Sequence, residues 1–326
     1  MRALVTGATG FTGGHLARRL ASAGDQVRVL VRQPALAVEL QALGIEVVGG
    51  DLTDRDSLRR VIAGADVVYN IAALYREAGL PASAYRAVNA DAVAAIVELA
   101  AEAGVGRVVH CSTVGVHGDI EHPPANEDAP LKPGDVYQET KLLGEQLGRE
   151  AAERLHQDLV IVRPTGIYGP GDRRLFKLFG QIAQGRFVML GTGRHFYHVT
   201  HIDDLCDGVR LAGTVEAAAG RTYIIGGGEV TTLADLVRIT AEVAGRPGPR
   251  INLPLWPVWL AGAACELACA PLRVSPPLYR RRVDFFRKSR AFDIDRARRE
   301  LGYAPTVGLR EGIRRTLEWY RDQGWI

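Results

Sequence analysis

The chain has 326 residues, of which 47% are hydrophobic and 24% are charged. These fractions are typical of a globular protein with a sizeable core, and they exclude a mainly disordered chain. The net charge of +3, from 40 basic and 37 acidic residues, shows no nucleic-acid-binding footprint, so we expect no nucleic-acid partner.

The first residues, MRALVTGATG, enter a strand and a turn directly, which leaves no room for the apolar region of a secretory signal. The cysteines show neither a metal-ligand spacing nor a dense disulfide pattern. They are Cys111, Cys206, Cys265 and Cys269. We therefore expect reduced thiols, no metal site and a cytoplasmic protein.

Short apolar runs rich in β-branched residues alternate with helical patterns in the first half of the chain. This alternation predicts a parallel sheet with helices on both faces, which the right-handed crossover rule makes a Rossmann-type, doubly wound α/β fold. The predicted strands are Ala3–Thr6, Val27–Val31, Glu46–Gly49, Val67–Ile71, Arg107–Ser112, Leu159–Arg163 and Arg221–Ile225. The predicted helices are Gly14–Ala23, Ser57–Ala63, Asn89–Ala103, Tyr137–Leu155, Leu233–Ala244 and Val307–Gly324.

Beyond about residue 170 the alternation gives way to loop-rich stretches. We expect a dinucleotide-binding domain formed by residues 1–168 and about 199–228. The smaller, discontinuous substrate-binding portion is then formed by residues from about 169 to 198 and from 229 to 326. Prolines in the segment 251–279 indicate that it is not one regular element.

The loop after the first predicted strand, Thr6–Gly13, has the sequence TGATGFTG. Gly7 permits a tight turn, Gly10 lets backbone N–H groups approach a pyrophosphate, and Gly13 allows close packing of helix on strand. Because a strand precedes this loop and a helix follows it, the loop predicts a dinucleotide site. The expected cofactor contacts in it are Gly7, Thr9, Gly10, Phe11, Thr12 and Gly13.

Tyr137 and Lys141 are predicted to lie one turn apart on the same face of a helix. A tyrosine has a pKa of about 10, and a neighbouring cation stabilises the phenolate and lowers this pKa toward neutral pH. Tyr137 can then take a proton from a substrate alcohol or return it to a ketone.

These motifs resemble the extended short-chain dehydrogenase/reductase family, and the resemblance covers nearly the whole chain. Besides the Gly-x-x-Gly-x-x-Gly spacing and the Tyr-x-x-x-Lys pair, the matching segments are Asp51-Leu52, Asn70-Ile71-Ala72-Ala73 and Arg163-Pro164-Thr165-Gly166-Ile167-Tyr168-Gly169-Pro170. The resemblance implies further cofactor contacts from Asp51, Leu52, Ala72, Pro164, Thr165, Tyr137 and Lys141. We also expect a small-molecule substrate and a homodimer.

Two further catalytic roles come from the resemblance. The family's catalytic hydroxyl falls on Thr113, five residues before Gly118, with Ser112 as the alternative. Asn89 matches the asparagine that organises a water relay to the lysine, although other residues replace the Gly-Thr that commonly follows it. His117 is expected to be a packing residue and not a base.

Arg32 bears on the choice between NAD and NADP. An acid at the end of the second strand would hydrogen-bond the ribose 2′-hydroxyl of NAD, but here Val31 occupies that position and Arg32 follows it. An arginine can pair with the 2′-phosphate of NADP, so the sequence favours NADP. The alternative is an exposed arginine without a ligand.

The substrate class is indicated by two features. Gly166 stands where nucleotide-sugar enzymes of the family commonly have an asparagine, and the segment Ile251–Leu272 carries only one charge, at Glu266. We expect a secondary alcohol or ketone of an apolar, steroid-like or flavonoid-like substrate. The alternatives are a nucleotide-sugar 4-epimerase or dehydratase with tightly bound NAD and, more remotely, a non-catalytic dinucleotide-binding regulator.

The segment 251–290 also suggests a membrane contact. Residues 273–290 contain seven basic residues and one acid, a net charge of +6, directly after the apolar stretch. This combination could bind an anionic bilayer surface peripherally. The alternatives are a buried helix followed by a solvated basic turn, or arginines that bind a sugar-nucleotide diphosphate.

Overall fold

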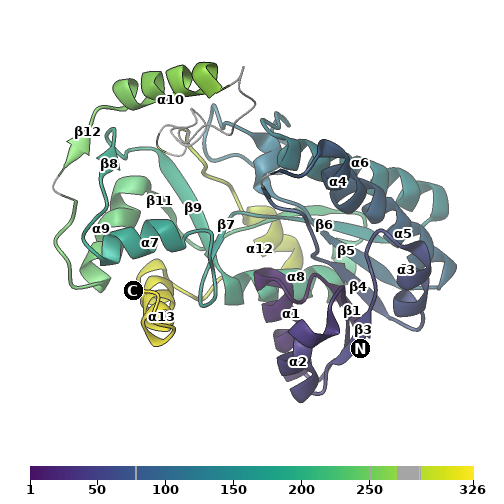
Figure 1. Ribbon diagram of the computed structural model, residues 1–326. Helices are drawn as coiled ribbons and strands as arrows, with labels where there is room; N and C mark the ends of the chain where they lie inside the picture. Colours follow the sequence, from purple (N-terminus) through teal and green to yellow (C-terminus); the bar gives the residue numbers. More distant parts are fainter. Residues whose placement is uncertain (78, 250, 270–285, 287) are drawn as a thin grey trace.

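The computed structural model describes residues 1–77, 79–249, 251–269, 286 and 288–326 (Figure 1). Its main sheet has the strand order β10-β6-β5-β4-β1-β2-β3, and every neighbouring pair is parallel. These strands are β1 Arg2–Thr6, β2 Gln26–Val31, β3 Glu46–Gly49, β4 Val67–Asn70, β5 Arg107–Cys111, β6 Leu159–Pro164 and β10 Thr222–Ile225. The predicted doubly wound Rossmann-type fold is therefore confirmed.

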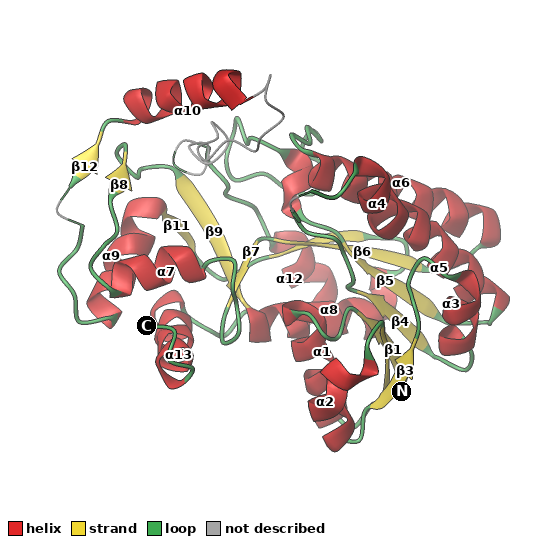
Figure 2. Ribbon diagram, in the orientation of Figure 1, coloured by secondary structure: helices red, strands yellow, loops and turns green. Residues whose placement is uncertain are grey.

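Helices cover both faces of this sheet (Figure 2). One face packs against α1 (Phe11–Ser22), α8 (Ile202–Thr214) and α12 (Asp295–Leu301). The other packs against α3 (Arg55–Ile62), α5 (Ala92–Glu102) and α6 (Val136–Leu155). The central strands β4 and β6 are buried along their whole length, because both of their faces are covered.

A second group of elements has its own core beside the carboxyl ends of the strands of the main sheet. Its strands are β7 Gly166–Tyr168, β9 Phe196–His201 and β11 Val230–Thr232, which form one sheet, and the short pair β8 Met189–Leu190 and β12 Asn252–Leu253. Its helices are α7 Phe176–Ala183, α9 Leu233–Val243 and α13 Leu309–Asp322. Phe179, Leu236 and Ile313 are completely buried in this core.

The remaining short elements connect the sheet to its helices. They are the helices α2 Val38–Ala42 and α4 Ala82–Arg86, the 3-10 turns Pro34–Ala37, Val114–His117 and Glu216–Ala218, and a π-helical turn at Ala87–Asp91. The π-helical turn leads directly into α5, so the helix predicted from Asn89 begins with a wider turn.

The helix α10, Leu255–Cys269, lies along the outer edge of the smaller part of the molecule (Figure 1). Only Gly262 in it is buried, and Trp256 and Leu267 are 67% and 76% exposed. The alternative that this stretch is a buried helix is therefore wrong. No helix in the described part of the chain is long and apolar enough to cross a membrane. Most of the basic cluster, Arg273, Arg280, Arg281, Arg282 and Arg287, lies outside the described residues.

Candidate active site

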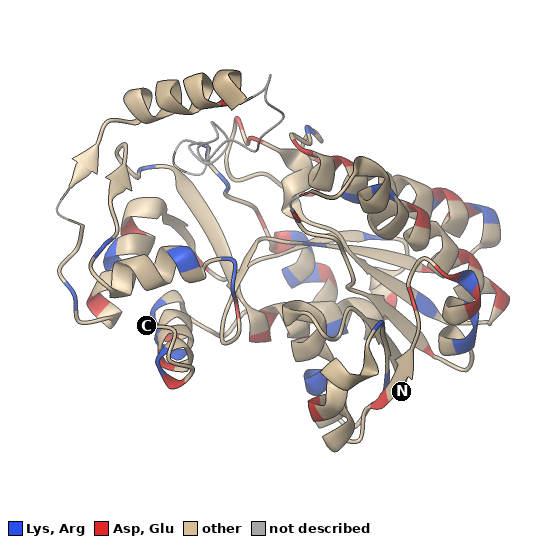
Figure 3. Cartoon of the chain, in the orientation of Figure 1, with Lys and Arg blue, Asp and Glu red and all other residues tan. Residues whose placement is uncertain are grey.

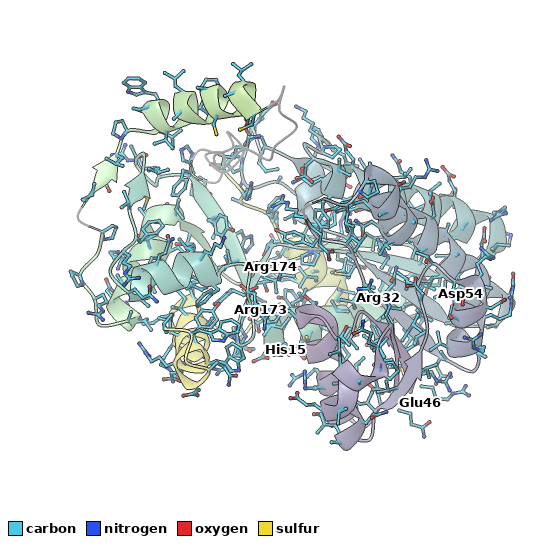
Figure 4. The ribbon with its side chains drawn as sticks, viewed as in Figure 1. His15, Arg32, Glu46, Asp54, Arg173 and Arg174 are labelled. Atoms are coloured by element: carbon cyan, nitrogen blue, oxygen red, sulfur yellow. The ribbon has the colours of Figure 1, made fainter. Side chains whose placement is uncertain are left out.

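A cavity of about 1280 Å³ opens at the carboxyl ends of β1, β2, β4, β5 and β6. This end of a parallel sheet is where doubly wound folds bind their ligands. The predicted site residues that line the cavity are Gly7, Thr9, Gly10, Phe11, Thr12, Gly13, Arg32, Asp51, Leu52, Ala72, Thr113, Tyr137, Pro164 and Thr165. The labelled side chains of His15, Arg173 and Arg174 lie near the boundary between the two parts of the molecule, and Arg32 lies within the part that contains the main sheet (Figure 4).

The glycine loop has the shape of a phosphate cradle. Gly7 has a φ of +71°, and a Cβ atom there would lie 2.8 Å from the Cα atom of Ala72. A Cβ atom on Gly13 would lie 2.4 Å from the carbonyl oxygen of Gly7, so only glycine allows this close approach. No side chain caps the first N–H groups of α1 at Gly10. The loop therefore fits the pyrophosphate of a dinucleotide.

The other end of the cavity has residues suited to an adenosine. Asp51 accepts hydrogen bonds from the hydroxyl of Thr53 at 2.6 Å and from its backbone N–H at 2.8 Å. These bonds, and to a lesser extent the charge of Arg32, lower the pKa of Asp51, so its carboxylate stays ionised. The Arg32 side chain is exposed at the rim of the cavity.

Tyr137 lies in the first turn of α6. Asp135 begins this helix by accepting a hydrogen bond from the N–H of Gln138 at 2.9 Å. The ring of Tyr75 meets that of Tyr137 edge-on, with 4.9 Å between centroids. Burial raises the pKa of Tyr137 by more than the charges of Arg174 and Arg76 lower it, so the phenol keeps its proton at neutral pH.

Lys141 lies beneath the cavity and does not line its wall. Its Nζ atom donates to the backbone carbonyl of Cys111 at 2.6 Å and lies 3.4 Å from Nε2 of His110. Burial lowers the pKa of Lys141 to about 8. The lysine therefore changes its charge close to neutral pH.

The two candidate hydroxyls differ in their partners. Thr113 Oγ1 accepts a hydrogen bond from the N–H of Gly115 at 3.0 Å, which leaves its own O–H available to a substrate oxygen. Ser112 Oγ is buried and has no hydrogen-bond partner among the described residues. Both residues line the cavity, whereas His117 does not; its ring lies 3.1 Å from the guanidinium of Arg163.

Asn89 lies in the π-helical turn and does not line the cavity. Its Oδ1 accepts from the N–H of Leu74 at 2.8 Å, and its Nδ2 donates to the carbonyl of Leu74 at 3.0 Å and to Thr140 Oγ1 at 3.2 Å. The side chain thus connects α6 to the loop that carries Tyr75.

Three residues of the site, His110, Tyr75 and Arg174, were not predicted from the sequence. His110 was detectable, because it is a titratable residue inside an apolar strand, three positions before Thr113. Tyr75 and Arg174 belong to loops, and the guanidinium of Arg174 lies 5.6 Å from the ring centroid of Tyr75. No local pattern places such loop residues together.

Comparison with known sequences and structures identifies the family of the chain. A model of the NAD dependent epimerase/dehydratase family matches residues 3–226. The chain is 31% identical to sterol demethylase protein B of Methylococcus capsulatus, over 100% of both chains. It is 32% identical to the 2-alkyl-3-oxoalkanoate reductase of Stenotrophomonas maltophilia, over 97% of this chain and 98% of that protein.

Among solved structures, gox2253 superposes with a TM-score of 0.85 at 28% identity and 99% coverage of both chains. DesIV, a dTDP-glucose 4,6-dehydratase from Streptomyces venezuelae with NAD and TYD bound, superposes with a TM-score of 0.78. It is 29% identical, over 100% of this chain and 98% of that one.

Proposed function

The chain belongs to the NAD-dependent epimerase/dehydratase family of extended short-chain dehydrogenases/reductases, and we propose that within it the protein reduces a ketone, or oxidises a secondary alcohol, of an apolar substrate. The observation that carries this proposal is the lining of the cavity. Seven Phe, Tyr and Trp side chains of the described chain line it, and the ring of Tyr75 packs against that of Tyr137. The seven residues are Phe11, Tyr75, Tyr137, Tyr197, Phe292, Trp319 and Trp325.

Dehydration of a sugar needs acid–base groups in addition to the tyrosine, because water must leave from a neighbouring carbon. The carboxylates in the described lining are Glu39, Asp51 and Asp172. Glu39 and Asp51 lie at the adenosine end. Asp172 is completely buried and accepts from the N–H groups of Arg174 at 3.0 Å and Leu175 at 2.9 Å. This arrangement favours simple reduction or oxidation over dehydration.

The proposed roles follow from the contacts. Thr113 donates a hydrogen bond from its hydroxyl to the substrate oxygen and holds this oxygen beside Tyr137. Because burial keeps the phenol of Tyr137 protonated, Tyr137 donates its proton to the oxygen of a ketone during reduction. When bound, the nicotinamide cofactor supplies or accepts the hydride at the carbonyl carbon.

We propose NADP as the preferred cofactor. Arg32 lines the adenosine end, and its guanidinium forms no ion pair with any carboxylate in the described ranges of the chain. It is therefore available to the 2′-phosphate of NADP. The neighbouring Arg18 already pairs with Glu39 at 3.1 Å.

The relatives support an apolar carbonyl substrate, since their names include a sterol demethylase protein and a 2-alkyl-3-oxoalkanoate reductase. A nucleotide sugar is the second candidate, because Arg173 and Arg290 also line the cavity and could bind a diphosphate. DesIV, which is similar over the whole chain, is a dTDP-glucose dehydratase.

The melting temperature distinguishes these substrates by ligand linkage. With saturating NADP present, we expect steroid-like ketones and 2-alkyl-3-oxoalkanoates to raise it, and UDP and dTDP to leave it unchanged. The same ketones should consume NADPH, which absorbs at 340 nm. A rise with a nucleoside diphosphate, together with no rise and no turnover with the ketones, would instead establish the nucleotide-sugar function.

A further inference from the structure

A buried row of polar side chains crosses the sheet from the glycine loop to Lys141. Thr6, Asn70 and His110 are direct register partners on the adjacent strands β1, β4 and β5. Thr6 Oγ1 lies 2.8 Å from Asn70 Oδ1, Asn70 Nδ2 lies 3.1 Å from His110 Nδ1, and His110 Nε2 lies 3.4 Å from Lys141 Nζ. All four residues are at most 1% exposed.

The hydrogen bonds at Thr6 fix the orientation of Asn70. Thr6 Oγ1 accepts from the backbone N–H groups of Ile71 and Ala72, each at 3.1 Å, and these bonds occupy both of its lone pairs. Its hydroxyl proton must therefore point to Asn70, which has to present its carbonyl oxygen there. The amide nitrogen of Asn70 then faces His110.

This orientation determines the tautomer of His110. Because Asn70 Nδ2 donates to Nδ1, the Nδ1 atom has to be the acceptor of the ring, and the single proton of the neutral imidazole lies on Nε2. Burial, and next the charge of Lys141, lower the pKa of His110 well below its ordinary value, so the ring stays neutral.

The Nε2–H group of His110 points at Lys141. An ammonium group has three donors and no acceptor. In its charged form, Lys141 would therefore place an N–H donor 3.4 Å from the Nε2–H donor of His110, and no hydrogen bond could form between them. A neutral amine has a lone pair that can accept this hydrogen bond. The fixed tautomer therefore stabilises the neutral form of Lys141.

We propose that His110 is a positioning residue that stabilises the neutral amine of Lys141 relative to its ammonium form in the cofactor-free protein. This proposal rests on the proposed acid–base role of Tyr137. Without a positive charge on Lys141, the phenol of Tyr137 keeps its proton, which is the form that donates to a ketone. His110 thus biases the Tyr137–Lys141 pair toward reduction.

The other groups around Lys141 do not replace His110 in this role. On β5, burial raises the pKa of the Cys111 thiol, which therefore stays neutral. On α6 itself, Tyr137 keeps its phenol proton, and Glu145 pairs with Arg163 of β6 at 2.6 Å. The charge of Glu145 is thus largely balanced, and His110 is the polar side chain in direct contact with the amine.

Nuclear magnetic resonance can measure the charge of Lys141 directly, because the chain has only four lysines, Lys132, Lys141, Lys177 and Lys288. Labelling the ε-carbon with ¹³C gives four signals, which arginine substitutions of the other three lysines assign. We expect Lys141 to titrate well below the other lysines. The His110→Phe variant, which removes the donor without adding charge, should raise the midpoint of Lys141 by about one pH unit or more, a tenfold change in proton affinity.

The Asn70→Asp variant tests the tautomer while keeping His110. Its carboxylate accepts a proton from Nδ1 and leaves a lone pair on Nε2, so the midpoint of Lys141 should rise here too. The same substitution in the His110→Phe background measures the effect of the added charge alone, and it should give a smaller rise. Lys177 serves as the internal control and should keep its midpoint in every variant.

A Lys141 midpoint that is unchanged or lower in His110→Phe would overturn the proposal, as would equal effects of Asn70→Asp with and without His110. If His110→Phe does not fold, an unchanged Lys141 midpoint in Asn70→Asp alone overturns the proposal.

These titrations need no substrate, so they succeed or fail independently of the proposed function. If that function also holds, ketone reduction by Asn70→Asp should decline at a lower pH than in the wild type, because a charged Lys141 lowers the pKa of Tyr137.

Discussion

At the scale of single residues, Tyr137 is the group whose removal should stop the chemistry. The Tyr137→Phe substitution keeps the ring that packs edge-on against Tyr75 but removes the proton donor. We expect turnover to fall by roughly 10²- to 10⁴-fold, the usual contribution of general acid–base catalysis, with cofactor affinity nearly unchanged. Steady-state kinetics and cofactor titration measure the two effects separately.

Tyr75→Phe is the matched control, because it removes a phenol whose one hydrogen bond among the described residues is accepted from Arg76 at 3.2 Å. Its turnover should stay close to that of the wild type. Full activity in Tyr137→Phe would show that the proton comes from elsewhere.

Arg32 should decide the cofactor preference. The Arg32→Asp substitution removes the partner of the 2′-phosphate and offers a carboxylate to the 2′-hydroxyl of NAD. Loss of a charge-assisted contact of about 1.5–3 kcal/mol corresponds to a change of roughly 10- to 100-fold in the ratio of NADP to NAD affinity. Fluorescence titration of both cofactors measures this ratio.

The control is Arg154→Asp, which reverses the charge of an exposed arginine at the far end of α6. This variant should keep the ratio of the wild type. Equal ratios in Arg32→Asp and the wild type would mean that Arg32 has no contact with the 2′-phosphate.

At the scale of elements, the strands were predicted well because their signal is local. Parallel strands covered on both faces are continuous apolar runs, and all seven runs found in the sequence form the main sheet. The helix expected from Gly14 begins at Phe11 in the structure. The first turn of this helix contains the polar and glycine residues of the phosphate loop. The apolar periodicity that predicts a helix is therefore absent from this turn.

The candidate site was predictable where one element carries the whole motif. The glycine loop and the Tyr137–Lys141 pair each depend on spacing within a single loop or helix. The row Thr6, Asn70 and His110 depends instead on the register of three strands that are distant in sequence. Sequence spacing contains no information on that register, so this row emerged only from the structure.

The helix α10 should contact a lipid surface. Its residues other than Glu266 are uncharged, as the nearly uniform tan of this helix in Figure 3 shows, and Trp256, Leu260 and Leu267 are exposed. A helix that is apolar on all sides normally lies inside a protein or a membrane. We expect binding to anionic vesicles that Trp256→Asp combined with Leu267→Asp weakens by tenfold or more in a sedimentation assay.

Leu43→Asp is the control for this effect, since Leu43 is 56% exposed but lies at the end of α2. This variant should bind vesicles as the wild type does. No binding of the wild-type protein to anionic or zwitterionic vesicles would refute the lipid contact.

At the scale of the whole molecule, the cavity is built from both parts of the chain. Trp319 and Trp325, at the C-terminal end, line it together with the glycine loop of the first helix. Between them the hydroxyl of Tyr320 donates to the carbonyl of Asp172 at 2.7 Å, in the loop that also carries Arg173. Substrate binding should therefore depend on residues that lie about 300 positions from the glycine loop.

Trp325 gives the sharpest test of this dependence. Its ring stacks on Tyr320 at 5.6 Å and 19°, and the guanidinium of Arg173 lies 5.3 Å from its centroid. These contacts hold the ring of Trp325 in the wall of the cavity. An aromatic contact with a bound apolar substrate contributes about 0.5–1.5 kcal/mol, so Trp325→Ala should raise the KM for substrate several-fold. The kcat should change little, because Trp325 lies in the binding wall and outside the Tyr137–Thr113 pair.

Trp256→Ala, on the exposed helix α10, should leave both constants unchanged in the absence of vesicles. A fall in kcat with constant KM in Trp325→Ala would contradict this division between a binding wall and a reacting centre.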